Sequence, residues 1–422
     1  MKLTQYFKNL SLLFVINFAV KPIWVFLIDR KFQLTLGKQA YGQYFEFLYL
    51  IYIFALVLDL GLHNFTVKSI SEWKENYKNY TAELWISKGI LSALFLGIVL
   101  IYSLTQISDS NHKWIFFLIA IEMLSFSLYQ FLRTFVQGLQ MLKLDSFLSS
   151  FDRIILILFG GGILAMIHNG FQISIYHFIF FHIAAYIFCF LVVGFVLRKK
   201  ISFTIDSYSP KQLIEIIHKG WPLIIIVLFM TIYSRIDVVL LGKMLPNGAE
   251  QCDVLALSLR IIDSAFNVLA LLSVFLLPTV AYNYTEGNLV YVRKVVLISC
   301  GIATLLSLGL IFTSLGFGDL IYAKLYPQHT GYELAVFKQQ VWCTLGVGWM
   351  YVFGSYLTAT ERYKELIVIV AIGVLLSLLS NIYAIPRYEA MGVAITSSFV
   401  QLTMGILHLL VAMYYLFRKP SL

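Results

Sequence analysis

Long, continuous apolar runs dominate the hydrophobic pattern of this chain. A helix that crosses a bilayer needs about 20 predominantly apolar residues, and by that rule the sequence predicts twelve spans. They lie near residues 8–28, 42–62, 86–105, 113–136, 146–167, 174–196, 220–242, 253–281, 292–314, 339–358, 365–385 and 391–416. The runs do not alternate between apolar and polar positions, as the strands of a membrane β-barrel do. The pattern therefore predicts an all-α integral membrane protein.

The predicted spans fall into two equal groups. A basic run, 198–200, and Pro210 mark a polar linker at the midpoint, and transporters are often built from two related halves. We expect an N-terminal six-helix lobe (1–197), a cytoplasmic linker (198–219) and a C-terminal six-helix lobe (220–422) around a central cavity. The polar stretches between spans are too short to form a separate soluble domain.

Composition and charge agree with a membrane protein. The 422 residues are 60% hydrophobic and only 13% charged, whereas soluble domains carry about 25% charged residues. The net charge of +9 arises mainly in connections on the side of the two termini, and the positive-inside rule assigns that side to the cytoplasm. We therefore expect a multi-pass protein with both termini cytoplasmic and no nucleic-acid partner.

Signals for enzymes and cofactors are missing from the sequence. It contains no P-loop, no GxSxG nucleophile elbow and no HExxH motif. The four cysteines lie singly, without the spacing of a disulfide framework or a metal site. We expect a non-enzymatic protein without a cofactor or metal, driven by a gradient of H⁺, of Na⁺ or of the cargo itself.

Three basic residues lie inside membrane-length apolar runs: Lys21, Arg235 and Arg260. A basic side chain near the bilayer centre costs roughly 2.5–3.5 kcal/mol on insertion scales, so it normally faces a watery cavity or a partner. One interpretation is that these three residues face a common cleft and attract an anion. The alternative is local ion pairing, for example of Arg260 with Asp263, three residues away on the same helix face.

Two predicted spans carry a polar stripe at helical spacing. The stripe of span eight consists of Arg260, Asp263 and Asn267, and that of span four of Glu122, Ser125, Tyr129, Arg133 and Gln137. Such a stripe suits a water-filled lumen, and a hydrogen-bonded seam between helices is the alternative. Tyr129 could then stack on sugar rings in a cavity that handles glycans.

Four acids also lie within predicted spans and are candidates for ion coupling. They are Glu46, Glu122, Asp237 and Asp263. A carboxyl group in such a position could exchange a proton or hold a cation when it is desolvated.

Local motifs resemble those of bacterial polysaccharide exporters of the Wzx type. Their pattern LG-x-x-x-(F/Y)-G, followed by D-(L/F/Y)-G, is matched by Leu36, Gly37, Tyr41, Gly42, Asp59, Leu60 and Gly61. A second pattern, D-x-x-(L/M)-LG and then A-x-R-(I/L), is matched by Asp237, Leu241, Gly242 and Arg260, with Ser258 in place of the alanine. A third, near the C-terminus, is matched by Asn381, Ile385, Pro386, Tyr388, Gly392 and Ala394, with Glu389 replacing a glycine and Val393 an alanine.

The resemblance implies a member of the multidrug/oligosaccharidyl-lipid/polysaccharide exporter superfamily, with a MATE- or MurJ-like fold that works by alternating access. Wzx-type members are flippases in the bacterial inner membrane. They translocate undecaprenyl-pyrophosphate-linked O-antigen units from the cytoplasmic to the periplasmic leaflet. The implied partners are this lipid-linked oligosaccharide, membrane lipid, and an O-antigen polymerase with its chain-length regulator.

Arginine suits the pyrophosphate of such a cargo, because its guanidinium recognises phosphate through two parallel hydrogen bonds. We expect Arg260, Arg235 and Lys21 to bind the pyrophosphate or acidic sugars. The remaining candidates are expected to shape the cavity or couple ions: Glu122, Asp263, Asp237, Glu46, Tyr129 and Asn267.

Two other functions remain open. A drug/cation antiporter, or an exporter of another polyprenyl-linked precursor, would share the fold, although a drug antiporter favours an acidic, aromatic cleft. A membrane glycosyltransferase or O-antigen polymerase typically needs a long outer loop with catalytic residues, and the connections here are short.

Overall fold

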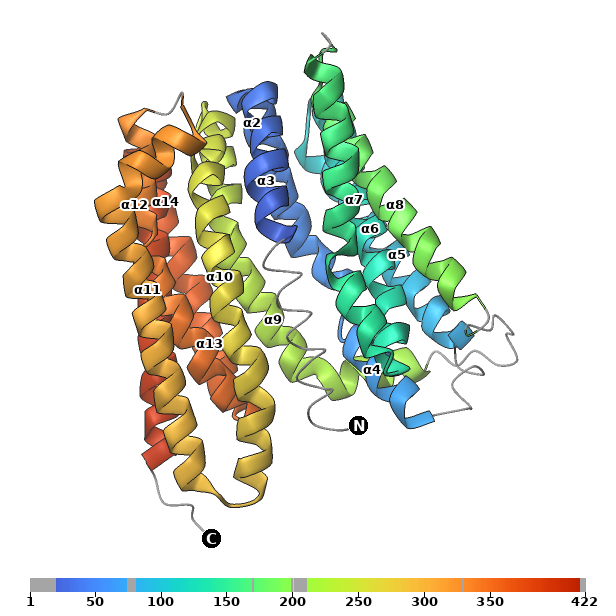
Figure 1. The fold of residues 1–422 in the computed structure, drawn as a ribbon, viewed down its shortest axis with the longest axis vertical. Helices are drawn as coiled ribbons and strands as arrows, with labels where there is room; N and C mark the ends of the chain where they lie inside the picture. Colours follow the sequence, from blue (N-terminus) through green and yellow to red (C-terminus); the bar gives the residue numbers. More distant parts are fainter. Residues whose placement is uncertain are drawn as a thin grey trace. The chain divides into compact units, whose positions relative to one another are not determined.

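The computed structural model describes residues 20–73, 81–168, 171–198, 200, 211–327 and 330–417. Within these residues the protein is helical and contains no strand, so the predicted all-α class is confirmed. Its elements are η1 (Trp24–Asp29), α2 (Arg30–Leu36), α3 (Lys38–Phe54), η2 (Ala55–Leu58), α4 (Leu62–Trp73), α5 (Thr81–Gln106), α6 (Ser110–Gly138), α7 (Leu142–His168), α8 (Ile175–Leu197), α9 (Lys211–Met244), α10 (Gly248–Thr285), α11 (Leu289–Leu325), α12 (Gly331–Gln340), α13 (Cys343–Ala359) and α14 (Tyr363–Phe417) (Figure 1).

The helices correspond to the predicted spans. Nine helices among the described residues are long and apolar enough to cross a membrane. One of these, α14, has 55 residues and contains the two predicted spans 365–385 and 391–416. The predicted span 339–358 corresponds to α13, which begins four residues later and ends one residue later than predicted. The chain is helical from residue 20, whereas residues 8–19 of the first predicted span lie outside the described residues. The protein is therefore a multi-pass membrane protein.

The chain divides into two compact units, and the division falls between Ile224 and Ile225 inside α9. In the first unit α6 packs against α3, α4, α7 and α8. In the second unit α13 packs against α10, α11 and α14. The central helices α6 and α13 thus organise their respective units.

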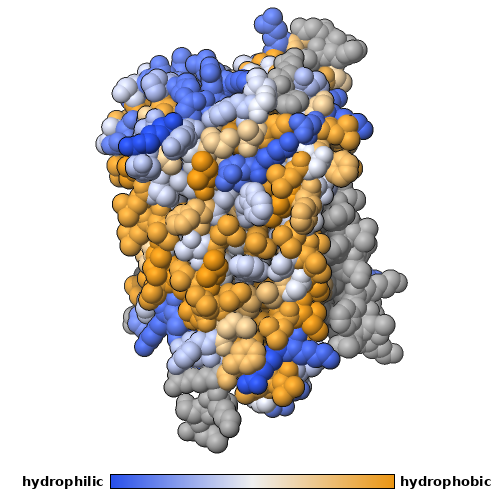
Figure 2. All heavy atoms as spheres, turned by 90° about the vertical axis from the view of Figure 1, so that its left-hand side faces the viewer, coloured by the Kyte–Doolittle hydropathy of each residue, from blue (hydrophilic) through white to orange (hydrophobic). Residues whose placement is uncertain are grey.

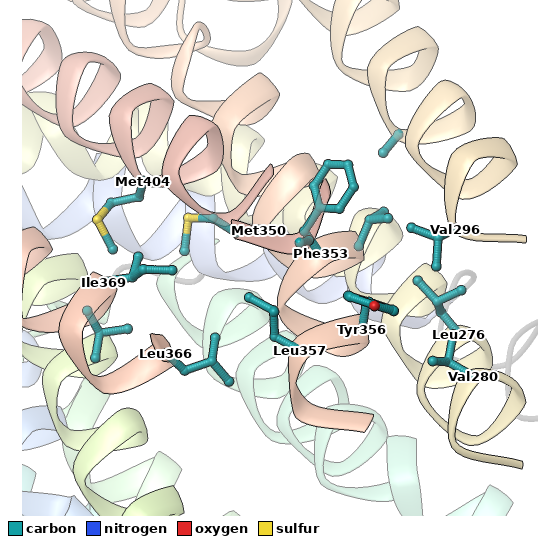
Figure 3. Close-up of a cluster of buried hydrophobic side chains, with 14 of the residues drawn as sticks. Leu276, Val280, Val296, Met350, Phe353, Tyr356, Leu357, Leu366, Ile369 and Met404 are labelled. Atoms are coloured by element: carbon teal, nitrogen blue, oxygen red, sulfur yellow. The ribbon is translucent and has the colours of Figure 1, made fainter. Parts of the chain in front are cut away.

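The core of the second unit is a closely packed cluster of side chains from α10, α11, α13 and α14. Phe353 and Leu357 of α13 are almost fully buried in it, together with Val296 of α11 and Met404 of α14 (Figure 3). Lipid tails are as apolar as leucine, so helices in a membrane associate through close packing rather than through removal of apolar surface from water. The fit between these side chains is therefore the main source of cohesion in this unit.

Glycine allows the backbones of α13 and α14 to touch. A Cβ atom at Gly346 would lie 2.0 Å from the carbonyl oxygen of Gln401, and one at Gly405 would lie 2.7 Å from that of Gly346. Real Cβ atoms do not approach backbone atoms so closely. Small residues have this role at many membrane helix interfaces, and here they fix the contact at the centre of the second unit.

One face of the second unit carries a broad hydrophobic band with hydrophilic residues at both ends (Figure 2). Large apolar side chains of α11 are strongly exposed, including Leu305 at 71% and Phe312 at 69%. Exposed apolar surface of this extent is unfavourable in water. It fits a face that contacts the hydrocarbon chains of a bilayer.

A kink separates the two spans within α14. Glu389 has φ 52° and ψ −132°, a conformation that costs a non-glycine residue about 1–3 kcal/mol. Its carboxylate accepts hydrogen bonds from Asn247 and Gln251 at 3.2 and 2.8 Å. Asn247 directly precedes α10, and Gln251 lies in the first turn of that helix. These contacts offset the strain and fix the turn between the last two spans.

Candidate functional site

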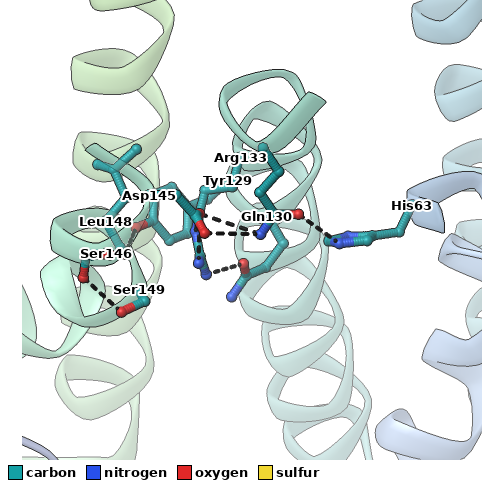
Figure 4. A network of polar contacts seen from close by, with 9 residues as sticks. His63, Tyr129, Gln130, Arg133, Asp145, Ser146, Leu148 and Ser149 are labelled. Carbon is teal, nitrogen blue, oxygen red and sulfur yellow. Dashed lines mark hydrogen bonds and ion pairs between the residues drawn. The ribbon is translucent and has the colours of Figure 1, made fainter. Parts of the chain in front are cut away.

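The polar stripe predicted on span four lies on α6, and three of its residues, Tyr129, Arg133 and Gln137, bond to α7 (Figure 4). Arg133 pairs with Asp145 of α7 at 2.9 Å, and Gln137 donates to the same carboxylate at 3.2 Å. Tyr129 donates to the backbone carbonyl oxygen of Leu148 on α7. These hydrogen bonds favour the second interpretation of the stripe, a seam between helices.

The position of Tyr129 contradicts its predicted place on a cavity wall. Its side chain is 0% exposed, and its hydroxyl is used by the seam. A ring enclosed between α6 and α7 cannot stack on a sugar without separating these helices. Nothing in the 3.6-residue periodicity distinguishes the two cases, because a seam and a lumen produce the same stripe.

The acids of the first unit lie in its interior. Glu122 of α6 is 4% exposed and accepts a hydrogen bond from the hydroxyl of Tyr44 on α3 at 3.1 Å. Glu46, also on α3, is 9% exposed. Glu122 is therefore a carboxyl group with a neutral hydroxyl donor in the membrane interior, which suits a group that exchanges a proton.

Arg153 of α7 interacts with acids and hydroxyl groups from several elements of the first unit, and the sequence analysis did not single it out. It lies eleven residues after the start of α7, or about 16 Å along the helix axis. Its electrostatic partners come from η1, α3, α6, α7 and α8 and include Asp29, Tyr52, Glu122, Asp152 and Tyr186. Its contact with Asp152 is 3.5 Å long, and 29% of its side chain is exposed.

Lys21 lies close to Arg153. The lysine interacts electrostatically with Arg153, Asp152 and Arg133, and it is half-buried. Lys21 and Arg153 thus lie near each other in the first unit and share Asp152 as an electrostatic partner. The local signal for Arg153 is its place inside the apolar run 146–167, which the sequence analysis did not use.

In the second unit, Arg235 of α9 lies close to two acids. It interacts electrostatically with Asp237 of its own helix and with Asp263 of α10. Asp237 is buried, and its carboxylate accepts hydrogen bonds from Ser397 of α14 at 2.9 Å and from the amide of Val238 at 2.8 Å. This group combines one cation with two acids.

Arg260 has a different environment. It is 7% exposed and donates to the hydroxyl of Tyr326 at 3.3 Å. Asn267, further along the same stripe of α10, is exposed and donates to the backbone carbonyl of Asp263 at 2.7 Å. The stripe of span eight therefore runs from a buried arginine to an exposed amide.

The structure thus brings candidates together within each of the two units. Lys21 lies with Arg153 in the first unit, and Arg235 lies with Asp237 and Asp263 in the second. Convergence of the cations of the two units on one cavity stays a prediction. The described residues contain no group of three or more His, Cys, Asp or Glu that could hold a metal ion.

Comparison of the structure with solved structures identifies transporters of similar fold. An inward-facing multidrug resistance MATE transporter of the MOP superfamily superposes with a TM-score of 0.70 at 13% identity, over 96% of this chain and 94% of that chain. A Vibrio cholerae MATE transporter in its bent form gives 0.62 at 15% identity, over 98% of each chain. A MOP superfamily transporter from Pyrococcus furiosus gives 0.59 at 14% identity, over 97% and 93%.

These TM-scores show that the chain has the fold of these MOP superfamily transporters, and at such low identities they show the fold alone. A comparison with curated protein sequences finds no match. The family assignment comes from the sequence itself, because residues 7–284 match the model of a family described as polysaccharide biosynthesis protein. That match covers more than half of the 422 residues, and the chain therefore belongs to the polysaccharide biosynthesis protein family.

Proposed function

We propose that this protein is a flippase for undecaprenyl-pyrophosphate-linked oligosaccharides such as O-antigen units. It moves them from the cytoplasmic to the periplasmic leaflet of the bacterial inner membrane by alternating access, with both of its termini in the cytoplasm. Membership of a polysaccharide biosynthesis family together with a transporter fold supports this proposal. The observation that carries it is the pair of half-buried cations, Lys21 and Arg153, in the membrane interior of the first unit.

The chemistry of the cargo explains why these cations are useful. A pyrophosphate is a compact multivalent anion, and a guanidinium binds it through two parallel hydrogen bonds. The attraction is stronger where water is excluded, because the local dielectric constant is low. Arg153 retains an exposed part of its side chain beside Asp152, so it can exchange that partner for a phosphate oxygen.

Arg235 and Arg260 would provide the corresponding contacts of the second unit. Arg235 can release Asp237 or Asp263 when an anion arrives, and Arg260 is positioned by Tyr326. In alternating access, the head group passes between cations that are first open to one side of the membrane and then to the other. The polyprenyl tail stays in lipid throughout.

Ion coupling is assigned to the buried acids. Glu122 in the first unit and Asp237 in the second are both enclosed and hydrogen-bonded by hydroxyl groups. A proton or Na⁺ that binds such a carboxylate changes the local charge by one unit and can thereby favour one of the two access states. The exported unit would then be available to a polymerase and a chain-length regulator on the periplasmic side.

A cell-based test uses a host whose surface glycan depends on this protein. Arg153→Ala and Arg260→Ala should each abolish surface glycan and leave lipid-linked units on the cytoplasmic side, while the protein is inserted at the wild-type level. Arg387→Ala is the matched control, because Arg387 is exposed and its guanidinium lies 3.9 Å from the ring of Tyr383. Normal glycan export by both cavity variants would refute the assignment.

The same strains separate the alternatives. A drug/cation antiporter would change drug resistance and leave glycan export intact. A polymerase would leave unpolymerised units displayed on the outer side, whereas loss of a flippase leaves them inside.

A further inference from the structure

A pocket of about 210 Å³ lies inside the first unit, apart from the cations described above. Its walls come from η2, the turn that follows it, α4, α5 and α6. The predicted topology places this joint between the second span and α4 at the cytoplasmic end of the unit. Pockets for drug-sized ligands have volumes of roughly 300–1,000 Å³, so this one suits a smaller occupant.

The pocket begins where the second span ends. Leu60 and Gly61 have φ values of 37° and 85°, so the chain turns sharply between η2 and α4. Lys88 of α5 is 3% exposed, and its ammonium donates to the carbonyl oxygen of Leu58 at 2.7 Å, at the end of η2. Asp59 accepts from the amide of His63 at 2.7 Å and so caps α4. The break in the chain therefore brings a lysine and an aspartate to one cavity.

These polar groups keep unused hydrogen-bonding capacity toward the pocket. Lys88 has three N–H donors, and within the described residues two of them are used, by Leu58 and by the hydroxyl of Ser127 at 2.6 Å. One carboxylate oxygen of Asp59 caps α4, which leaves the other. Gln130 uses its carbonyl oxygen for Arg133, which leaves its amide N–H groups. Donors and acceptors thus line the same space.

The charges of the pocket nearly balance. Lys88 and Asp59 interact electrostatically with opposite signs. Burial lowers the pKa of His63 below its ordinary value, so the imidazole on α4 is neutral near pH 7. Arg133 and Asp145, which also act on His63, form an ion pair with each other. A lining with little net charge does not select strongly for an anion or a cation.

Aromatic side chains form much of the remaining wall. Phe126 and Phe131 of α6 line the pocket, and the ammonium of Lys88 lies 5.8 Å from the ring centroid of Phe131. Apolar faces beside a few convergent polar groups are typical of small-molecule sites. The C–H face of a sugar ring packs on such a surface, while its hydroxyl groups both donate and accept hydrogen bonds.

We propose that this pocket binds a single hydroxyl-rich ring, a monosaccharide unit, through Lys88, Asp59, Ser127 and Gln130. This inference rests on the proposed function in one respect, because the natural source of the sugar could be one residue of the exported glycan. A free cytosolic sugar has the same chemistry. The experiment distinguishes the two sources.

The binding test uses the full-length protein in nanodiscs and saturation-transfer NMR with a panel of methyl hexosides and N-acetylhexosaminides as probes. Ser127→Ala should weaken binding roughly 3- to 10-fold, the effect of losing one neutral hydrogen bond. Asp59→Asn should weaken it by about 10-fold or more, because charge-assisted hydrogen bonds are stronger. An asparagine can still cap α4 through its side-chain oxygen, so this variant is expected to fold.

The matched control is Ser125→Ala, two residues away on α6. Its hydroxyl donates to the backbone of Ile121 at 2.8 Å, and it does not line the pocket. Saturation transfer that falls in Ser127→Ala and Asp59→Asn but not in Ser125→Ala supports the proposal. Absence of transfer, equal transfer in all variants, or displacement of the sugar by inorganic phosphate at constant ionic strength overturns it.

Glycan export by the same variants identifies the source of the sugar. Loss of export together with loss of binding assigns the pocket to the cargo, and loss of binding with normal export assigns it to a free sugar. Export by the wild type without any sugar binding would overturn this inference and leave the proposed flippase function intact. Sugar binding by a protein that exports no glycan would overturn the proposed flippase function and leave this inference intact.

Discussion

Replacement of Arg133 by methionine tests whether the polar stripe of α6 is a structural seam. Arg133 and Asp145 are joined at 2.9 Å, and their side chains are only 12% and 14% exposed. Methionine keeps most of the aliphatic length of arginine but removes its charge and its donors. Among the described residues, the side-chain donor that remains for Asp145 would then be the amide of Gln137, at 3.2 Å.

The magnitude follows from this burial. Removal of one partner of a buried ion pair typically costs about 3–5 kcal/mol, and we expect the lower end, about 3 kcal/mol, because both groups retain some exposure and Gln137 remains. At roughly 2–4 °C for each kcal/mol in a unit of this size, the melting temperature should fall by about 6–12 °C.

The assay is thermal unfolding of the purified protein, measured as the fraction of protein that remains monodisperse after heating. The same measurement on further variants gives a double-mutant cycle. Asp145→Asn and the combined variant complete the cycle, and the coupling energy between the two positions should exceed about 1 kcal/mol. Glycan export measured per folded molecule should stay within about threefold of the wild type. If Arg133→Met is as stable as the wild type but exports no glycan, the stripe is not a structural seam and its residues belong to the cargo pathway instead.

Three further predictions concern packing, pH and coupling. Gly346→Ala should destabilise the second unit by about 1–3 kcal/mol, because its Cβ would meet the backbone of Gln401 at 2.0 Å. Gly354→Ala on the same helix has only ordinary contacts, and equal melting temperatures for the two variants would contradict this packing. Burial lowers the pKa of His63 from 6.5, so its contribution to the docking of α4 is present at neutral pH and is lost as the pH falls below about 6.5. The protection factors of the α4 amides, which correct for the slower intrinsic exchange at lower pH, should therefore fall between about pH 7 and about pH 5, and constant protection factors would disprove this assignment. Asp237→Asn should abolish the dependence of transport on an ion gradient while cargo binding persists, and gradient-driven transport by this variant would exclude Asp237 as the coupling acid.

The helices could be predicted from the sequence because their signal is strong. In a membrane, every backbone group of a span must be satisfied internally, so a long apolar run has few alternatives to a helix. The division of α14 near Glu389 was also predicted, since Pro386 and a polar residue interrupt the run there. The positive φ of Glu389 was not, because its stabilising contacts come from Asn247 and Gln251, more than a hundred residues earlier.

The environment of the polar residues was predicted less well. Helical spacing placed the polar residues of α6 in one stripe, but it could not show that Tyr129 bonds to Leu148 rather than facing water. Arg153 and Lys88 were not among the candidates from the sequence, although both lie just inside predicted spans. Their surroundings depend on which helices pack together, and that information is carried by three-dimensional contacts rather than by periodicity.

Transport in proteoliposomes tests the central claim most directly. The cargo is a fluorescent polyprenyl-pyrophosphate oligosaccharide, compared with the same glycan on a neutral polyprenyl ether, and an added quencher reports the leaflet. We predict that the wild type translocates the pyrophosphate form and that Arg153→Ala and Arg260→Ala lose at least tenfold in rate, while Arg387→Ala does not. Equal translocation of the neutral lipid, or full activity without both arginines, would contradict recognition of the head group by cations.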